Sequence, residues 1–327
     1  MIQKKIRIGV LGCASIAKRL VIPAIKELSS EFELVAIASR TYQKATEFSD
    51  HFGAIAIEGY DKLINRVDID AIYIPLPTGM HYKWILKTLN AGKHVLSEKS
   101  ITTNFSETNH VIEVARKNKL LVMENFMFKY HNQHKIVLKN LKSNSLGSIR
   151  LFRSQFGFPP MKEGNFRYDN TLGGGSLLDA GAYTVMASRF FLGSNQEVVS
   201  AALYYDKNNR VDIFGNASIK NEEGVISQLS FGFDNFYQCN LEFWGSKGRL
   251  FLPKAFTPKP DETTKVLIET NNESDLVKVK PDNHFLNILK TFSELLFNGD
   301  YEPIFDDILD QSRTLNDIKE KAIIINI

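Results

Sequence analysis

The stretch IRIGVLGCASIA, residues 6–17, decides the fold of this chain. An apolar run ends at Gly12, and the residues that follow, 15–28, repeat apolar side chains at roughly helical spacing. Gly12, Ala14 and Ala17 occupy the positions of a GxGxxG turn, and the first of them alone is glycine. A strand, a tight turn and a helix in this order favour a dinucleotide-binding turn, although a plain turn before a helix would have a similar sequence.

A dinucleotide fold brings the cofactor pyrophosphate against backbone amides at the start of a helix, where small side chains allow a close approach. The candidates for this contact are Gly12, Ala14, Ser15 and Ile16. Their position supports the assignment, because the dinucleotide fingerprint belongs at the first strand-to-helix turn of such a domain.

Strands and helices alternate through the first 125 residues. Short apolar strands are expected at 6–12, 33–39, 54–57, 70–77, 94–99 and 120–125. Helices are expected between them, at 15–28, 41–52, 59–66, 79–92 and 105–118. Strands that are apolar on both faces and alternate with helices indicate a parallel sheet covered on both sides. This part of the chain is predicted to be a doubly wound α/β domain of the Rossmann type.

The pattern changes after Asn125. A helix at 131–144 and a strand at 148–156 lead through a glycine-rich turn to a run of long strands rich in β-branched and aromatic residues. These strands are expected at 197–205, 210–220, 224–234, 237–246 and 248–253, and closing helices at 284–298 and 308–323.

The sequence therefore predicts two domains. Residues 1–124 form the dinucleotide-binding domain, and residues 125–327 form an α+β domain for substrate binding and oligomerisation, with a large, open, mostly antiparallel sheet. The pattern leaves open whether the last helix packs back against the first domain. A cofactor half followed by a substrate half places the expected site in the cleft between them.

One face of the second-domain sheet is expected to point outward and to carry aromatic side chains. Phe231, Phe233 and Phe243 stand at alternating strand positions and are interpreted as part of this face. An exposed apolar sheet face of this size usually finds a partner, so a homodimer or homotetramer formed through the sheet is expected.

Composition excludes several classes of protein. The formal charge of +3 arises from 40 basic and 37 acidic residues spread along the 327-residue chain, which argues against the clustered basic face of a nucleic-acid-binding protein. The apolar runs are too short for a membrane span or a signal peptide. Two cysteines are too few for a disulfide framework, so a reducing, cytoplasmic location is expected.

The end of the second strand indicates which cofactor is bound. An acidic residue here would bind the adenosine ribose hydroxyls, but the sequence has Ser39 and Arg40. A hydroxyl and a guanidinium suit a 2′-phosphate, since arginine offers forked donors to a dianion. NADP(H) is therefore favoured over NAD(H), and the alternative is a solvated arginine at the start of a helix.

With these residues in place, the chain resembles the dehydrogenase family of glucose-fructose oxidoreductase, inositol dehydrogenase and rhizopine catabolism (Gfo/Idh/MocA). The stretches that carry the resemblance are IGVLGCASIA, DAIYIPLPTGMHYKWILKTLNAGKHVLSEKS, ENFMFKYHNQ, LGSIR and GGGSLLDAGAY. The third and fifth are most similar to a branch with glucose-fructose oxidoreductase, dihydrodiol dehydrogenases and ketoreductases of nucleotide-linked deoxysugars. GCASIA is most similar to the ketoreductases.

The resemblance implies roles for individual residues. EKS matches the family's EKP, which would put Lys99 beside the nicotinamide and the reacting carbon, with Glu98 near the cofactor. PLPTGMH matches a loop along the cofactor, and its candidate contacts are Leu76, Pro77 and His81. DAGAY matches the substrate-side motif with Asp179 and Tyr183, and the weaker candidates for substrate binding are Phe126, Lys129 and Arg167.

These residues suit the reduction of a ketone. Hydride transfer builds negative charge on the carbonyl oxygen, which requires a proton donor and a nearby cation. We expect Tyr183 to act as the acid, and Lys99 to polarise the carbonyl and favour ionisation of the tyrosine. The resemblance implies an NADPH-dependent ketoreductase whose substrate is a carbohydrate, most plausibly a keto-deoxysugar on a nucleoside diphosphate. Two alternatives remain: an aldose, polyol or dihydrodiol dehydrogenase, and a catalytically silent NADP(H)-binding regulator.

Two further features carry smaller expectations. His131 and His134 lie one helical turn apart, but no carboxylate or cysteine accompanies them at ligand spacing, so no metal site is expected. Ser100 stands where the family usually has a proline, often after a cis peptide, and the sequence leaves the isomer of the Lys99–Ser100 bond open.

Overall fold

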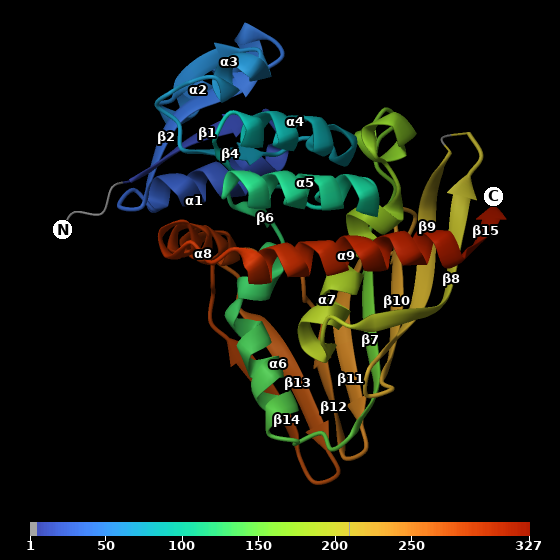
Figure 1. The fold of residues 1–327 in the computed structure, drawn as a ribbon. Coiled ribbons are helices and arrows are strands. Elements are labelled where there is room, and N and C mark those ends of the chain that lie inside the picture. Colours follow the sequence, from blue (N-terminus) through green and yellow to red (C-terminus); the bar gives the residue numbers. More distant parts are fainter. Residues whose placement is uncertain (1–4, 209) are drawn as a thin grey trace. The chain divides into compact units, whose positions relative to one another are not determined.

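The computed structural model describes residues 5–208 and 210–327. The chain forms two compact units, and Figure 1 labels most of their helices and strands. Unit 1 comprises Met1–Asn125 and Phe285–Leu309, and unit 2 comprises Phe126–His284 and Asp310–Ile327. Within the described residues, no helix is both long enough and apolar enough to cross a membrane.

Unit 1 contains a six-stranded sheet in the order β3-β2-β1-β4-β5-β6, and every neighbouring pair is parallel. Its strands are β1 Ile6–Leu11, β2 Phe32–Ser39, β3 Ile55–Glu58, β4 Ala71–Ile74, β5 His94–Ser97 and β6 Val122–Glu124. The helices are the π-helical η1 Ala17–Val21, α1 Ile22–Glu27, α2 Tyr42–Phe52, α3 Tyr60–Ile64, α4 Thr78–Asn90 and α5 Phe105–Asn118. This confirms the predicted doubly wound fold.

Local sequence explains where these elements begin and end. α5 starts after Asn104, whose side chain accepts a hydrogen bond from the amide of Glu107 at 3.0 Å, and it ends at Lys119 in a left-handed conformation. All four residues of β4 are buried, as expected for a central strand covered on both faces.

The chain returns to unit 1 near its end. α8 spans His284–Asn298 and α9 spans Glu302–Lys321, and unit 2 begins again at Asp310 within α9. Phe305 of α9 is buried in the core cluster of unit 1. The Arg116 guanidinium lies 5.8 Å from the Phe305 ring centre, and its Nε donates a hydrogen bond to Glu302 at 2.9 Å. These contacts make the start of α9 part of the unit 1 core.

Unit 2 contains a nine-stranded sheet in the order β14-β13-β12-β11-β7-β10-β9-β8-β15. The pairs β7·β10 and β8·β15 are parallel and the other neighbours are antiparallel, which confirms the mostly antiparallel prediction. The strands are β7 Ile149–Gly157, β8 Gln196–Asp206, β9 Val211–Asn221, β10 Ile226–Gly232, β11 Gln238–Gly245, β12 Gly248–Leu252, β13 Thr264–Thr270, β14 Ser274–Val279 and β15 Ala322–Asn326.

Two of the helices of unit 2 carry the substrate-side motif. The helices of this unit are η2 Met127–Tyr130, α6 Asn132–Lys142, η3 Phe166–Tyr168, η4 Asn170–Leu172, the π-helical η5 Leu177–Gly181 and α7 Ala182–Leu192. Helix η5 continues directly into α7, so residues 177–192 form one helical segment that carries Asp179 and Tyr183.

The prediction that Phe231, Phe233 and Phe243 point outward is wrong. All three are buried, and the Phe243 ring centre lies 5.4 Å from that of Phe191 in α7. The strands bury one face beneath α7 and η5, and alternation puts these phenylalanines on that face. The neighbouring Trp244 lies on the other face and is 54% exposed.

The end of the chain also differs from the prediction. The closing helix was expected to continue to Ile323, but α9 ends at Lys321 and β15 pairs with β8 at the sheet edge. The β-branched run Ile323–Ile325 favours a strand once an edge is available. β13 and β14 were not predicted, although the polar stretch 271–273 between them is typical of a turn.

Candidate active site

The phosphate-turn candidates lie between β1 and the first helix. Gly12 has a φ of 125°, and a Cβ added there would approach Leu76 Cδ2 to 2.8 Å, so a larger residue would be strained. The helix begins at Ser15, which is exposed, and Ala14 and Ile16 are half-buried. The turn is therefore small, and its first helical amides are available to an anion.

Ser39 is the last residue of β2, the strand next to β1, and Arg40 follows it. Leu11 pairs with Ala38, so the ends of the two strands lie side by side. Ser39 is buried and Arg40 is exposed. The structure thus brings Arg40 to the same sheet edge as the phosphate turn.

His81 does not lie on an open surface. Its ring is completely buried, with Nδ1 2.8 Å from the Ser100 carbonyl oxygen and Nε2 2.7 Å from the Leu76 carbonyl oxygen. Burial lowers the pKa of His81, and the hydrogen bonds to these carbonyls act in the opposite direction. His81 therefore joins the loop after β4 to the segment after β5, whereas Leu76 and Pro77 are half-buried.

Lys99 follows β5 and is half-buried, and the Lys99–Ser100 peptide bond is cis. The neighbouring Glu98 turns into the unit, where its Oε1 accepts hydrogen bonds from the Tyr73 hydroxyl at 2.6 Å and the Asn125 amide at 2.7 Å. Burial raises the pKa of Glu98, and these two hydrogen bonds oppose the shift. Glu98 thus has polar partners within unit 1 besides the neighbouring charge of Lys99, which also lowers its pKa.

In unit 2, Tyr183 lies within a group of phenylalanine rings. The ring centres around it belong to Phe126 at 5.7 Å, Phe128 at 5.9 Å, Phe156 at 5.1 Å and Phe256 at 5.5 Å. The Tyr183 hydroxyl donates to the Met127 sulfur at 3.8 Å. These rings fix the tyrosine ring by shape, and sequence reasoning did not identify Phe128, Phe156 and Phe256.

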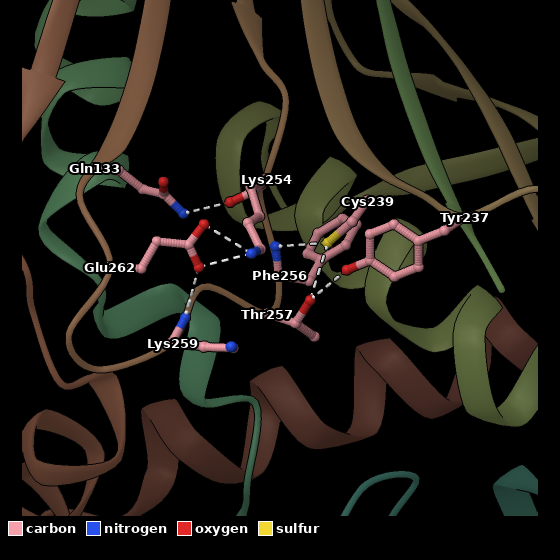
Figure 2. Close-up of polar contacts among 8 residues, drawn as sticks. All are labelled: Gln133, Tyr237, Cys239, Lys254, Phe256, Thr257, Lys259 and Glu262. Carbon is pink, nitrogen blue, oxygen red and sulfur yellow. Dashed lines mark hydrogen bonds and ion pairs between the residues drawn. The ribbon is translucent and has the colours of Figure 1, made fainter.

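Phe256 belongs to a loop that is tied from two sides (Figure 2). Gln133 of α6 donates from Nε2 to the carbonyls of Lys254 at 3.0 Å and Ala255 at 3.1 Å. On the other side, the Phe256 amide donates to the Cys239 sulfur of β11 at 3.4 Å. The loop therefore presents Phe256 to Tyr183 in a fixed position.

The other substrate-side candidates are also in unit 2. Arg167 Nε donates to Asp179 Oδ2 at 2.5 Å, and the guanidinium lies 4.7 Å from the Phe166 ring centre. The structure therefore brings Arg167 and Asp179 together as a half-buried ion pair. Phe126 is buried, and Lys129 in η2 is half-buried.

Comparisons with known proteins agree with this architecture. Residues 6–126 match the model described as "Oxidoreductase family, NAD-binding Rossmann fold", and residues 135–251 match the "GFO/IDH/MocA C-terminal domain". The chain belongs to the Gfo/Idh/MocA oxidoreductase family.

Several relatives of this Gfo/Idh/MocA protein are sugar reductases. A dTDP-3,4-didehydro-2,6-dideoxy-alpha-D-glucose 3-reductase from Actinomadura kijaniata is 40% identical over 90% of this chain and 89% of its own. One of the same name from Saccharopolyspora spinosa is 40% identical over 89% and 87%.

A solved structure is similar over the whole chain. The 3-ketoreductase KijD10 from Actinomadura kijaniata, in complex with NADP and TDP-benzene, matches with a TM-score of 0.96 and 38% identity, covering 99% of this chain and 100% of its own. Variants of KijD10 with a tyrosine replaced by phenylalanine or a lysine replaced by alanine match as well.

Asp212 is a further polar residue of this Gfo/Idh/MocA protein that sequence reasoning missed. Its buried carboxylate accepts hydrogen bonds at the start of the helical segment 177–192, from the Ser176 hydroxyl and the Leu177 amide. A lone carboxylate in an otherwise apolar strand, RVDIFG, was the available signal.

Three histidines form a buried cluster in unit 2. His131 of the α6 start and His284 have ring centres 5.7 Å apart, and His134 Nε2 lies 3.0 Å from the Ala255 carbonyl oxygen. Burial, and after it the charge of His131, lower the pKa of His134 and His284 to about 3 each. Among the described residues, no group of three or more His, Cys, Asp or Glu could hold a metal ion.

The neutral histidines predict a loss of stability in acid. In the folded state His134 and His284 stay neutral down to a pH of about 3, whereas in the unfolded chain they gain protons below their ordinary pKa of 6.5. Their contribution is complete above pH 6.5 and is lost as the pH falls, by up to about 1.4 kcal/mol per pH unit for each group. Urea unfolding at several values between pH 7 and pH 5, followed by circular dichroism, measures this slope.

His134→Gln should reduce the pH dependence of the free energy of unfolding by the contribution of one histidine. His51→Gln, at an exposed histidine, should leave this dependence unchanged. Equal slopes in the wild type and His134→Gln would contradict the assignment.

Proposed function

We propose that this protein is an NADP(H)-dependent ketoreductase that reduces a keto group of a deoxysugar linked to a nucleoside diphosphate, with the sugar C3 as the reacting carbon. The support comes from the 40% identity to dTDP-sugar 3-reductases and from the similarity to KijD10. Unit 2 is proposed to bind the sugar, and unit 1 the cofactor.

The observation that carries the proposal is the pair Lys99 and Tyr183. The lysine and the tyrosine replaced in KijD10 are separated in its sequence by the same number of residues as Lys99 and Tyr183. Both residue types have the chemistry that a ketone reduction requires, a cation and a proton donor.

The proposed mechanism assigns one task to each residue. Bound NADPH supplies the hydride. Lys99 polarises the carbonyl through its ammonium and stabilises the negative charge that develops on oxygen. Tyr183 donates its phenolic proton to that oxygen, which leaves an alcohol, and the tyrosine regains a proton from solvent. The aromatic rings around Tyr183 restrict the orientations of the phenol, which favours a productive geometry.

The residues of unit 1 fit NADP(H). The turn at Gly12 has no room for a larger side chain, which suits close approach of a pyrophosphate to the amides after Ala14. Arg40 is exposed at the end of β2 and would bind the 2′-phosphate. Arg167 and Asp179, the ion pair of unit 2, are proposed to contact the sugar.

Replacing the reacting residues should abolish turnover without loss of the cofactor. Lys99→Ala and Tyr183→Phe are each expected to slow hydride transfer by about 100-fold or more, because each removes charge stabilisation or proton transfer at the carbonyl oxygen. Stopped-flow absorbance of NADPH with a dTDP-linked 3-keto-deoxysugar measures the rate, and NADPH fluorescence measures binding. Tyr204→Phe, at a tyrosine of β8, is the matched control. Hydride transfer at the wild-type rate in Tyr183→Phe would exclude the proton-donor role.

Arg40 should determine the choice of cofactor. Arg40→Ala is expected to raise the KM for NADPH by about 10- to 100-fold and to leave the KM for NADH nearly unchanged, since a charge-assisted contact to the 2′-phosphate is lost. Steady-state kinetics with both cofactors test this. An unchanged ratio of kcat/KM values for NADPH and NADH would mean that Arg40 is a solvated surface residue.

We also propose that the chain forms a homo-oligomer through the outer face of the unit 2 sheet. Trp244 is 54% exposed and Leu276 is 49% exposed on this face, with the half-buried Phe251 and Leu267 between their strands. Charged side chains cross the same face, where Arg249 lies near Glu242 and Glu269. A face that carries apolar residues and both signs of charge is self-complementary across a twofold axis.

Introducing a charge at the centre of this face should dissociate the oligomer. Trp244→Glu is expected to give a monomer at micromolar concentration, because a carboxylate would replace an apolar ring at the interface and would have to be taken out of water. Light scattering measures the mass, and Val67→Glu, at a residue of unit 1 that is 93% exposed, is the control. A monomeric wild type, or a Trp244→Glu variant of unchanged mass, would contradict the proposed interface.

A further inference from the structure

The carboxylate of Asp212 is buried at the start of the helical segment that carries Tyr183. Asp212 lies in β9 and is 7% exposed. Its Oδ2 accepts two hydrogen bonds, from the Ser176 hydroxyl at 2.7 Å and from the Leu177 amide at 2.7 Å. One oxygen atom therefore connects β9 to the start of the helical segment 177–192.

The glycine-rich turn before this segment is shaped around the same carboxylate. Gly175 has a φ of 119°, and a Cβ added there would collide with Asp212 Oδ1. A Cβ on Gly174 would collide with the Arg167 carbonyl oxygen, and the Gly175 amide donates to that oxygen at 3.0 Å. The stretch GGGS thus allows both the Asp212 carboxylate and the Arg167 segment to approach the backbone closely.

The helical segment couples the position of its first turn to the position of Tyr183. Tyr183 lies about 10 Å along the helix from Ser176 at the usual rise of about 1.5 Å per residue. Beside it, the Ala182 carbonyl accepts a hydrogen bond from Gln311 Nε2 at 2.9 Å. A helix is stiff over this length, so a displacement of its first turn would move the phenol relative to the rings of Phe156 and Phe256.

We propose that Asp212 is a positioning residue for Tyr183, acting through the hydrogen bonds that hold the start of the helical segment; this rests on the proposed function. A charged acceptor makes stronger hydrogen bonds than a neutral one, and a negative charge at a helix amino terminus is favoured by the helix dipole. Asp212 does not contact the reacting atoms. Its effect on the rate comes from the orientation of Tyr183.

The surroundings of Asp212 also predict a pH effect. The titratable groups that face the carboxylate are Tyr205 of β8 and Lys319 of α9. Burial raises the pKa of Asp212 to about 6, and the hydrogen bonds from Ser176 and Leu177 oppose the shift. As the pH falls through about 6, the carboxylate gains a proton, its charge is lost, and the hold on the helix weakens.

The kinetic test compares two substitutions with a matched control. Asp212→Ala is expected to slow hydride transfer by about 10- to 100-fold and Asp212→Asn by less, since asparagine keeps one acceptor oxygen. NADPH binding should be unchanged, because Asp212 lies in the other unit. Ser227→Ala should leave the rate unchanged, because Ser227 contacts Ser188, in the later part of the same helical segment, at 2.7 Å. In the wild type, the rate of hydride transfer should fall as the pH falls through about 6. This decrease should be absent in Asp212→Asn.

A second measurement does not depend on activity. In protein labelled with 3-fluorotyrosine, the fluorine resonance that is missing in Tyr183→Phe belongs to Tyr183. This resonance should shift in Asp212→Asn and stay unchanged in Ser227→Ala. A wild-type rate, pH profile and fluorine resonance in Asp212→Asn would overturn the positioning role.

The two proposals can fail separately. An inactive wild type with the expected shift of the resonance would overturn the proposed reaction and support the positioning of Tyr183. If Asp212→Ala does not fold, Asp212→Asn decides.

Discussion

Parallel pairing of β1, β4 and β5 is the constraint on which the rest of unit 1 depends. Val10 pairs with Tyr73, and Tyr73 pairs with Leu96, so the three strands end at one edge of the sheet. Because the strands are buried on both faces, their side chains cannot meet a ligand along the strand. The residues just beyond the strand ends, among them Gly12, Leu76 and Lys99, are therefore the ones that a ligand at this edge could reach.

In unit 2, Tyr183 lies on a helical segment and not beyond the end of a parallel strand. The sheet of unit 2 buries one face, and aromatic residues from η2, β7 and the loop after β12 fill the space around Tyr183. Apolar contacts fix a ring by shape, and hydrogen bonds add directional constraints on the helix that carries it. Polar ties do so here: Asp212 holds the start of the helical segment, and Gln311 holds the carbonyl next to the tyrosine.

Much of the fold could be predicted because local sequence patterns determine its helices and strands. α5 at 105–118 and α8 at 284–298 were predicted with their observed bounds, and in the structure the Asn104 cap fixes the start of α5. The direction of the second sheet's faces could not be predicted in this way. Alternation shows that Phe243 and Trp244 face opposite sides, but which side is buried depends on where α7 packs.

The candidate site likewise contains residues that could be placed from the sequence and residues that could not. Gly12, Leu76 and Lys99 follow strands, and their convergence could be deduced from parallel topology. His81 was expected along the cofactor, yet its ring is enclosed by two backbone carbonyls, which no spacing reveals. Phe256 and Asp212 are far from Tyr183 in the sequence, and they reach it or its helix through strand pairing and a folded loop.

The two units therefore differ in how their functional groups depend on sequence. In unit 1 the turn at Gly12 offers backbone amides, which many small residues would leave available, and this explains how a turn with a single glycine can still suit a pyrophosphate. In unit 2 the orientation of Tyr183 depends on particular side chains. An uncharged side chain at position 212 can match the length of the aspartate but does not carry its charge. A Cβ at Gly175 would collide with the Asp212 carboxylate. We therefore expect substitutions at Asp212 or Gly175 to alter the orientation of Tyr183.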